Sequence, residues 1–182
     1  MENPYKRKKE PVANKKLILE AAAEISAHNS WSFVTFQAIA DKTGLSKGGI
    51  IHHFPSKEAL LDELYDQSLL ELSELIIREK KNDPKINSAY AYLKIVCNDI
   101  QDSRYLNTMK VILNGTVNNS HLCQKWKKWI SEYLLPDFTD KTSAMAIITL
   151  LVADGMWFSD TLNIYPISLE QKNNILLQLK NL

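Results

Sequence analysis

Residues 43–61 read TGLSKGGIIHHFPSKEALL, and their side chains suit the binding of an anion. Lysine and histidine supply N–H donors, while Ser46 and Ser56 stand where serine commonly caps the start of a helix. Lys57 would lie in the first turn of such a helix, where a cation opposes the helix dipole at a cost of about 0.3–1 kcal/mol. The backbone N–H groups of that turn bind anions, so a phosphate bound there would reverse the sign of this cost.

Gly48 and Gly49 weaken the helix in which they would lie. Each glycine costs about 1 kcal/mol relative to alanine in a helix interior. Without a Cβ, however, the backbone can approach a nucleic-acid surface closely. Tight packing of Gly48 against the preceding helix accounts equally well for that one residue, and both accounts can hold together.

Two short helices must position these residues. Thr35 is a good N-cap for the first, which Gly44 ends in the left-handed conformation that glycine tolerates. Ser46 caps the second, which stops before Pro55. Their small core would contain Ile39, Ala40, Leu45, Ile50 and Phe54. This pattern is typical of a helix-turn-helix, whose second helix enters the DNA major groove, although a plain helical corner has the same glycine turn.

The sequence from Leu17 to Leu61 resembles the tetracycline-repressor (TetR) family of bacterial one-component regulators. The resemblance covers LILEAAAEISAHNSW and TFQAIADKTGLSKGGIIHHFPSKEALL. Its spaced signature comprises Thr35, Ile39, Ala40, Gly44, Leu45, Ser46, Gly48, Phe54, Lys57 and Leu60. The resemblance implies a homodimer that places its two third helices in successive major grooves of a near-palindromic operator. It also implies a helical C-terminal domain that binds an inducer.

The resemblance further implies individual contacts with double-stranded DNA. It places Thr35 near a phosphate at the cap of the second helix, and it places Lys47 and Gly49 toward the bases. The family usually has tyrosine where this chain has Ile51, so apolar contact with a thymine methyl group replaces a hydrogen bond there. His53 and Lys57 would meet phosphates. The full set predicted to bind DNA is Thr35, Ser46, Lys47, Gly48, Gly49, Ile51, His52, His53 and Lys57.

His52 and His53 are adjacent, hence about 100° apart on a helix, so they do not converge on one metal ion as ligands at i and i+4 do. We predict no metal site and interpret both as donors to DNA. Lys6, Arg7, Lys8 and Lys9 would form a mobile arm that adds sequence-independent attraction to DNA, or a solvated tail without a partner.

Composition indicates an ordinary globular protein, with 45% apolar and 24% charged residues in 182. Residues 1–60 hold nine Lys and Arg against six Asp and Glu, whereas residues 61–182 hold thirteen against fifteen, so the positive end is the part suited to an anion. Cys97 and Cys123 lie in apolar helical patterns and are predicted to be buried thiols. The N-terminus lacks a hydrophobic signal core, and the apolar stretch AMAIITLLVA is shorter than the about 20 residues that span a bilayer. We expect a cytoplasmic protein without a membrane partner.

Helical spacing dominates the chain and predicts an all-α fold. Residues 1–56 would form a three-helix helix-turn-helix DNA-binding domain, and residues 57–182 a helical ligand-binding and dimerisation domain. The predicted helices span residues 13–28, 36–43, 47–54, 57–81, 86–101, 103–117, 121–135, 141–162 and 169–180.

The larger domain has aromatic residues that suit a small-molecule effector. Trp126 and Trp129 share a helical stripe, which is usually core, but with Met109 and Leu113 opposite they would form a flat-sided apolar cavity. Asp154 interrupts an apolar run, so it should be paired, face solvent at a dimer seam, or attract a cationic ligand. The residues predicted to bind the effector are Leu93, Cys97, Met109, Leu113, Trp126, Trp129, Asp154 and Phe158.

The last two predicted helices carry more apolar residues than a monomer surface needs, namely Ala144, Ile147, Ile148, Leu151, Ile175, Leu176 and Leu179. A four-helix seam of a homodimer would bury them, and packing within one chain is the competing account. We find no pattern of an enzyme, such as paired carboxylates, a nucleophile elbow or a phosphate-binding glycine loop, and predict no cofactor.

We therefore predict a ligand-responsive DNA-binding repressor that releases its operator when a lipophilic aromatic effector, which could be cationic, binds the C-terminal domain. An activator or a co-repressor-dependent regulator would have the same fold. A helical interaction module that does not bind DNA is the third interpretation.

Overall fold

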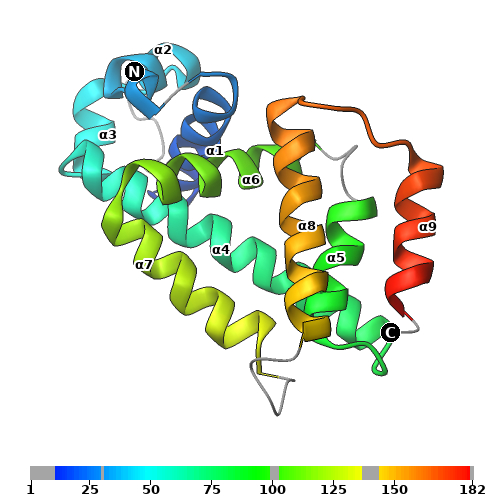
Figure 1. Cartoon of the computed structure of the whole chain (residues 1–182). Coiled ribbons are helices and arrows are strands. Elements are labelled where there is room, and N and C mark those ends of the chain that lie inside the picture. Colours follow the sequence, from blue (N-terminus) through cyan, green and yellow to red (C-terminus); the bar gives the residue numbers. More distant parts are fainter. Residues whose placement is uncertain (1–10, 30, 99–102, 137–143, 181–182) are drawn as a thin grey trace, which may run out of the picture. The chain divides into compact units, whose positions relative to one another are not determined.

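The computed structural model describes residues 11–29, 31–98, 103–136 and 144–180, and within them it contains helices and no strand (Figure 1). The first elements are α1 (Pro11–His28), the 3-10 turn η1 (Trp31–Phe33), α2 (Phe36–Thr43) and α3 (Lys47–His53). They are followed by α4 (Lys57–Asn82), α5 (Ser88–Asn98), α6 (Ser103–Asn118), α7 (Ser120–Trp129), the π turn η3 (Ile130–Leu134), α8 (Ala144–Leu162) and α9 (Leu169–Lys180). The prediction of an all-α fold is confirmed. The basic arm of Lys6, Arg7, Lys8 and Lys9 lies outside the described residues.

The first compact unit comprises Met1–Leu64, in which α1, α2 and α3 pack on one another. It extends beyond residue 56, the domain boundary expected from the sequence, because α4 contributes the buried Leu60 and Leu64 to it. Of the predicted core, Ala40 and Leu45 are only half-buried. The buried apolar side chains of the unit include Ile18, Ala22, Val34, Ile39, Ile50, Phe54 and Leu60. This core holds α3 by one face and leaves its other face to solvent.

The second compact unit comprises Tyr65–Leu182 and has α5 at its centre. Every residue of α5 is buried except Lys94 and Asn98. Both α8 and α9 pack on α5, and α7 packs on α6 (Figure 1). Lys172 of α9 forms a buried ion pair with Asp160 of α8 at 3.0 Å, which joins the last two helices.

Several helix ends differ from the prediction for local reasons. α1 begins at Pro11, a position where the missing N–H of proline has no cost. α5 begins at Ser88 because the Asn87 side chain accepts a hydrogen bond of 2.8 Å from the Tyr90 backbone N–H, as an N-cap does. The helix predicted for 121–135 is α7 followed by the π turn η3, whose end is closed by a 3.2 Å bond from the Leu135 N–H to the Ile130 carbonyl. The predicted start of α8 and end of α5 fall outside the described residues.

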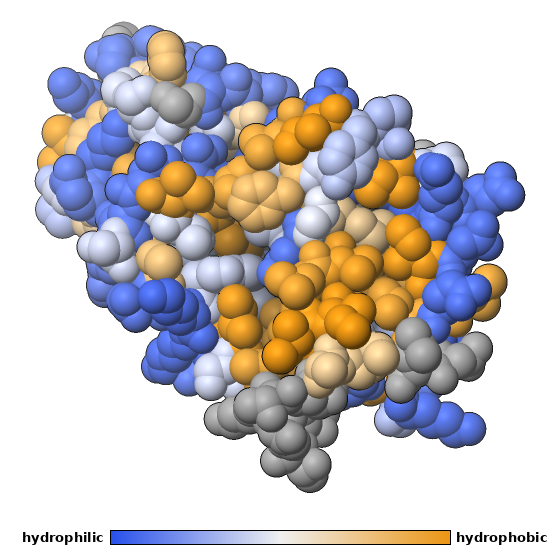
Figure 2. All heavy atoms as spheres, viewed as in Figure 1, coloured by the Kyte–Doolittle hydropathy of each residue, from blue (hydrophilic) through white to orange (hydrophobic). Residues whose placement is uncertain are grey.

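One face of α8 is apolar and exposed. Its side chains are Ile147, Ile148, Leu151, Phe158 and Leu162. Figure 2 shows hydrophobic side chains gathered over this helix. At 19 residues, α8 is the one helix in the described part of the chain that is long and apolar enough to cross a membrane, whereas the sequence analysis counted only its apolar stretch AMAIITLLVA. Its other face is buried, mainly against α5, and core helices of soluble proteins meet the same criterion.

Both cysteines are thiols, as predicted. Cys97 is buried in α5, and this burial raises its pKa to about 11. Cys123 on α7 is only half-buried, so the prediction that both thiols are buried is wrong for this residue. Because the thiolate is the reactive form, Cys97 is an inert core residue at neutral pH.

Candidate DNA-binding surface and effector-binding unit

Side-chain caps hold the turn between α2 and α3. The Thr35 hydroxyl accepts a hydrogen bond of 3.1 Å from the Ala38 backbone N–H and so caps α2. Gly44 ends this helix at a φ of 70°, which side-chain-bearing residues rarely adopt. The Ser46 hydroxyl accepts a hydrogen bond of 3.1 Å from the Gly49 N–H and caps α3. Thr35, Gly44 and Ser46 therefore fix the geometry of the turn between α2 and α3.

α3 presents one face to the core and the other to solvent. Ile50 is fully buried, whereas its neighbour Ile51 is 43% exposed. The residues predicted to bind DNA that are exposed are Thr35, Ser46, Lys47, Gly48, Gly49, Ile51 and His52, and those that are half-buried are His53 and Lys57. All of them lie in the first compact unit, on or beside the helix-turn-helix.

The two glycines of α3 differ in what surrounds them. A Cβ placed on Gly48 would meet no atom within 4 Å, so packing against α2 is the wrong account of this residue. A Cβ on Gly49 would lie 3.2 Å from the Ser46 hydroxyl oxygen, the atom that caps the helix. The lack of a side chain at Gly49 thus leaves room for the Ser46 hydroxyl that caps α3. Gly48 has no steric neighbour among the described residues that would explain it.

The start of α4 stabilises negative charge. The Ser56 hydroxyl caps it by accepting a hydrogen bond of 3.1 Å from the Ala59 N–H. The pKa of the exposed Glu58 is lowered, first by a hydrogen bond from its own backbone N–H and then by one from Ser56. Lys57 lies in the same turn, and its ammonium group donates a hydrogen bond of 3.2 Å to the Ser32 carbonyl in η1. Lys57 is therefore already oriented, with one of its three N–H donors in use.

His52 and His53 lie edge to face, with ring centroids 5.8 Å apart and an interplanar angle of 65°. They border a hollow of about 160 Å³ on the first unit. Its other lining residues are Pro11, Asn14, Leu45 and Gly49. The hollow lies between the start of α1 and the outer part of α3, so the two imidazoles are placed beside the predicted DNA-binding face.

The residues predicted to bind an effector differ in their exposure. Leu93, Cys97, Met109 and Trp129 are buried, Leu113, Trp126 and Asp154 are half-buried, and Phe158 is exposed. A cavity of about 350 Å³ in the same unit is lined by another set, namely Glu71, Glu74, Leu75, Arg78, Arg104, Tyr105 and Thr108. Sequence reasoning missed this set because its contacts join residues of α4 to residues of α6. Helical spacing carries no signal of such pairs.

Trp126 and Trp129, which were predicted to line an apolar cavity opposite Met109 and Leu113, pack on each other. Their rings stack on each other at 4.9 Å with an angle of 7°, and Trp129 also stacks on Tyr133 at 5.6 Å. The Trp129 indole N–H donates a hydrogen bond of 2.8 Å to the Ser73 hydroxyl. Trp129 is thus a packed core residue with a satisfied N–H group.

Asp154 is paired with two neutral donors. The Tyr92 hydroxyl donates to its carboxylate at 3.1 Å, and the Trp157 indole N–H donates at 3.0 Å. Burial raises the pKa of Asp154 above its usual range, and the two hydrogen bonds oppose this rise. Among the described residues, no cation forms an ion pair with this carboxylate. Of the alternatives drawn from the sequence, pairing within the chain is the one observed.

The apolar face of α8 includes a glycine that sequence reasoning did not single out. Gly155 lies between Leu151 and Phe158 on this face, and a Cβ there would meet no atom within 4 Å. On α9 the residues Ile175, Leu176 and Leu179 are half-buried, while Leu177 is 61% exposed. The unpartnered surface is therefore mainly that of α8, with a smaller share from α9 than predicted.

A capped helix-turn-helix with an exposed second helix, joined to a larger all-α unit, defines the class of helix-turn-helix transcription regulators. The chain belongs to the TetR family. Residues 18–64 match the family described as bacterial regulatory proteins, tetR family. Residues 87–182 match the family described as tetracyclin repressor-like, C-terminal domain. No curated protein matches the sequence.

Solved structures with the same fold are TetR-type proteins of low sequence identity. A member of the TetR family from Streptomyces coelicolor A3 is 15% identical with a TM-score of 0.70, over 91% of this chain and 96% of that chain. A transcriptional regulator from Pseudomonas aeruginosa PAO1 is 20% identical with a TM-score of 0.71, over 96% and 91%. The multidrug binding protein EbrR complexed with malachite green is 16% identical with a TM-score of 0.69, over 91% and 96%. At these identities the likeness concerns the fold.

Proposed function

We propose that this chain is a homodimeric transcriptional repressor that binds a near-palindromic operator through α3 and releases it when an effector binds the second unit. Gly48 is the observation that carries the DNA-binding part. A glycine costs about 1 kcal/mol inside a helix, and no steric neighbour in the described part of the chain accounts for it. The backbone of α3 can approach a DNA surface closely at this point.

The exposed residues around Gly48 supply contacts of two kinds. Lys47 donates to base edges in the major groove, and Ile51 contacts a thymine methyl group. Thr35, His53 and Lys57 contact phosphates, which fix the register of α3 on the duplex without reading sequence. Lys57 keeps two N–H donors for a phosphate while it holds the Ser32 carbonyl.

A second copy of the chain covers the apolar face of α8. An isologous contact joins the same patch of two protomers, so this one helix supplies both sides of the seam. Gly155 lets the two α8 helices approach closely where they cross, which accounts for a glycine in an otherwise large-residue face. The dimer places its two α3 helices about 34–36 Å apart, one turn of DNA, so that both half-sites are bound together.

The effector is a lipophilic aromatic compound. EbrR, which shares the fold, has been solved with malachite green and with ethidium. The second unit of this chain has the aromatic residues that such a compound needs, and among the predicted contacts Trp126 and Phe158 are the aromatic ones that are not fully buried. Binding changes the spacing of the two α3 helices. A coupling of about 1–3 kcal/mol between effector and operator suffices.

An activator or co-repressor-dependent regulator is the alternative within the same fold. The sign of the effector's influence on operator affinity separates it from a repressor. A helical interaction module would show no DNA binding with a steep salt dependence.

The test is selection of bound fragments from the host genome with the purified full-length chain, followed by fluorescence anisotropy with and without ethidium. We expect a near-palindromic consensus, binding that weakens steeply with salt, and weaker binding with ethidium present. Absence of binding to every duplex even in dilute buffer would overturn the proposal. Protein of this function acts in the cytoplasm, where the chromosome lies.

A further inference from the structure

The cavity of about 350 Å³ in the second unit is bordered by α4 and α6. Its volume lies in the range of small-molecule sites. Glu71, Glu74, Leu75 and Arg78 line it from α4, and Arg104, Tyr105 and Thr108 line it from α6. The residues that sequence reasoning assigned to the effector are different ones, so this cavity is a separate candidate.

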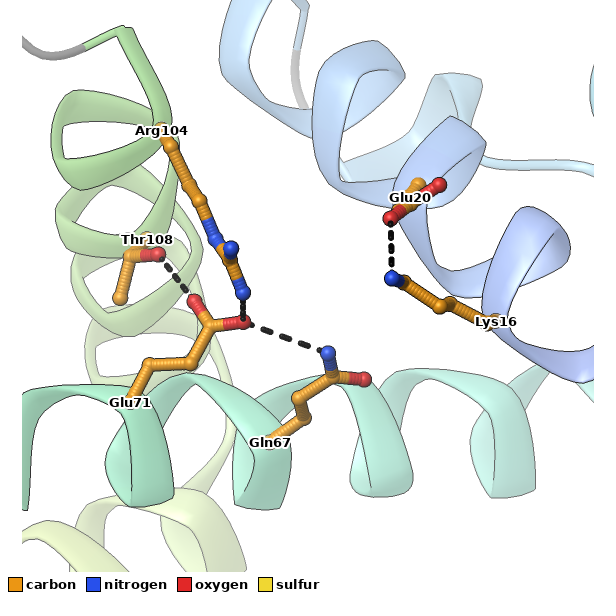
Figure 3. Close-up of polar contacts among 6 residues, drawn as sticks. All are labelled: Lys16, Glu20, Gln67, Glu71, Arg104 and Thr108. Atoms are coloured by element: carbon orange, nitrogen blue, oxygen red, sulfur yellow. Dashed lines mark hydrogen bonds and ion pairs between the residues drawn. The ribbon is translucent and has the colours of Figure 1, made fainter. Parts of the chain in front are cut away.

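Glu71 is the polar centre of the cavity (Figure 3). Its carboxylate accepts hydrogen bonds from the Arg104 guanidinium at 2.7 Å, the Thr108 hydroxyl at 2.9 Å and the Gln67 amide at 3.3 Å. Gln67 lies one turn before Glu71 on α4, whereas Arg104 and Thr108 reach it from α6. Gln67 and Thr108 orient the carboxylate, and Arg104 supplies the positive charge.

Arg104 and Glu71 differ in their exposure to water. The Arg104 side chain is 73% exposed, while that of Glu71 is 22% exposed. Most of the Arg104 side chain is thus already in contact with water, where a guanidinium that leaves Glu71 can be solvated. The carboxylate of Glu71, by contrast, stays within the cavity and requires another cation. Arg104 is therefore a displaceable partner of a positioned carboxylate.

Asp154 is a poorer cation site for a structural reason. Both of its donors, Tyr92 and Trp157, are buried neutral groups that already hold the carboxylate. Burial also raises the pKa of Asp154, which means that its charge is disfavoured at this position. Glu71 instead lines a cavity and holds a guanidinium that has free access to solvent.

We infer that the cavity between α4 and α6 binds a planar, delocalised cation with N–H donors, an amidinium or a guanidinium on an aromatic ring, which replaces Arg104 at Glu71. This deepens the proposed function, on which it rests, by naming the site and the chemical class of the effector. The group that Glu71 holds in the free protein is itself a planar guanidinium, which donates one N–H bond of 2.7 Å to Oε1 of this carboxylate.

The rest of the cavity suits the remainder of such a ligand. Once Arg104 has turned away, Glu71 and Glu74 outnumber Arg78 among the charged groups of the lining. Tyr105 offers an aromatic side chain and Leu75 an apolar one. The ligand also removes the Arg104 tie between α6 and α4, the helix that continues into the first unit.

Isothermal titration calorimetry of the full-length protein with benzamidine tests the site. We expect Glu71→Gln to weaken benzamidine binding by about tenfold, because the charge that receives the amidinium is lost. We expect Arg104→Ala to strengthen it several-fold, because the competing cation is removed. The two substitutions must shift affinity in opposite directions. Benzamide, the neutral isostere, should bind at least about tenfold more weakly than benzamidine.

Matched controls come from Lys16 and Glu20, an exposed ion pair within one turn of α1 in the first unit (Figure 3). Lys16→Ala and Glu20→Gln carry the same charge changes and should leave benzamidine affinity unchanged. Thermal unfolding of each variant checks that it is folded. Benzyltrimethylammonium, a cation without N–H donors, should bind more weakly than benzamidine, and equal binding would overturn the requirement for N–H donors.

Three results would overturn the inference. Benzamidine affinity that falls in both Glu71→Gln and Arg104→Ala would mean that their ion pair only supports the fold. Benzoate binding that depends on Arg104 would make the cavity an anion site. Absence of benzamidine binding would remove the site altogether. Operator binding by the ligand-free protein is measured separately, so that its presence keeps the proposed function intact when this inference fails.

Discussion

The Tyr92 hydroxyl of α5 donates a hydrogen bond of 3.1 Å to the Asp154 carboxylate of α8, and so joins the two helices that pack most closely in the second unit. Tyr92 is fully buried, and desolvation raises its pKa well above the usual range, with the nearby Asp154 charge as the next cause. The phenol therefore stays protonated and serves as a donor. A carboxylate in an apolar helix is in this way held without a cation.

Removing the Asp154 carboxylate should destabilise the fold. Asp154→Ala leaves the buried Tyr92 hydroxyl and the Trp157 indole N–H without their acceptor. We expect a loss of about 1–3 kcal/mol in the free energy of unfolding. Urea denaturation at pH 7 and fixed protein concentration measures it. A variant as stable as the wild type would show that these donors have other partners.

The pH dependence of stability should separate Asp154→Asn from the wild type. Because burial raises the pKa of Asp154, the folded wild type binds a proton more tightly than the unfolded chain. The wild type therefore loses stability relative to Asp154→Asn as pH rises from about 3.9, the unfolded value, through the raised folded value. Above that value the difference is constant. Denaturation curves of both proteins from pH 4 to pH 8 test this, and a difference of opposite slope contradicts it.

Ethidium binding should not require the charge of Asp154. The carboxylate is held by neutral donors inside the unit, so we expect Asp154→Asn to change ethidium affinity by less than about threefold. Quenching of tryptophan fluorescence provides the measurement. A tenfold loss in a variant that remains folded would restore Asp154 as the site that attracts a cationic effector.

Gly48→Ala should change stability and DNA affinity in opposite directions. The structure has room for the added methyl group, and alanine favours the helix by about 1 kcal/mol at most. On DNA the same methyl group would hold the α3 backbone away from the surface. We expect a higher melting temperature together with at least about tenfold weaker operator binding, measured by anisotropy. Unchanged operator affinity would remove close approach as the reason for this glycine.

Lys57→Ala should weaken binding to every DNA sequence about equally. A lysine that meets a phosphate contributes about one unit to the slope of log affinity against log salt, so the slope should fall by about one. Salt titrations with the operator and with an unrelated duplex give both slopes. Lys128→Ala, which removes an exposed lysine of the second unit, is the control and should alter neither. Loss confined to one base pair of the operator would assign Lys57 to base reading.

Leu151→Glu should convert the dimer to a folded monomer. Leu151 is 65% exposed in the single chain, so a charge there costs little in the monomer but would be buried in the seam. Sedimentation or size-exclusion with light scattering measures the mass. Leu70→Glu on α4 places the same charge at a residue that is 57% exposed and should leave the dimer intact. A dimer that survives Leu151→Glu would locate the seam elsewhere.

Local signals predicted the helix-turn-helix well because its structure is set by neighbouring residues. α2 and α9 have the bounds expected from their caps and stops. Gly44 adopts the left-handed conformation that its place in the turn requires. The exposed side of α3 also follows from local pattern, since Ile50 and Phe54 are buried at helical spacing and the residues between them point elsewhere. The nine residues predicted to contact DNA consequently lie in one unit.

What the sequence by itself determined is therefore the helices, their caps, the turn at Gly44 and the family. The tertiary structure alone decided that Gly48 has no packing partner among the described residues, that Trp129 bonds to Ser73 of α4, and that Asp154 is held by Tyr92. It also decided that Glu71 meets Arg104 across α4 and α6. The physical reason is distance along the chain. A cap acts within four residues, whereas these contacts depend on how helices pack. Helical periodicity predicts which face of a helix is buried, but not which helix packs against that face.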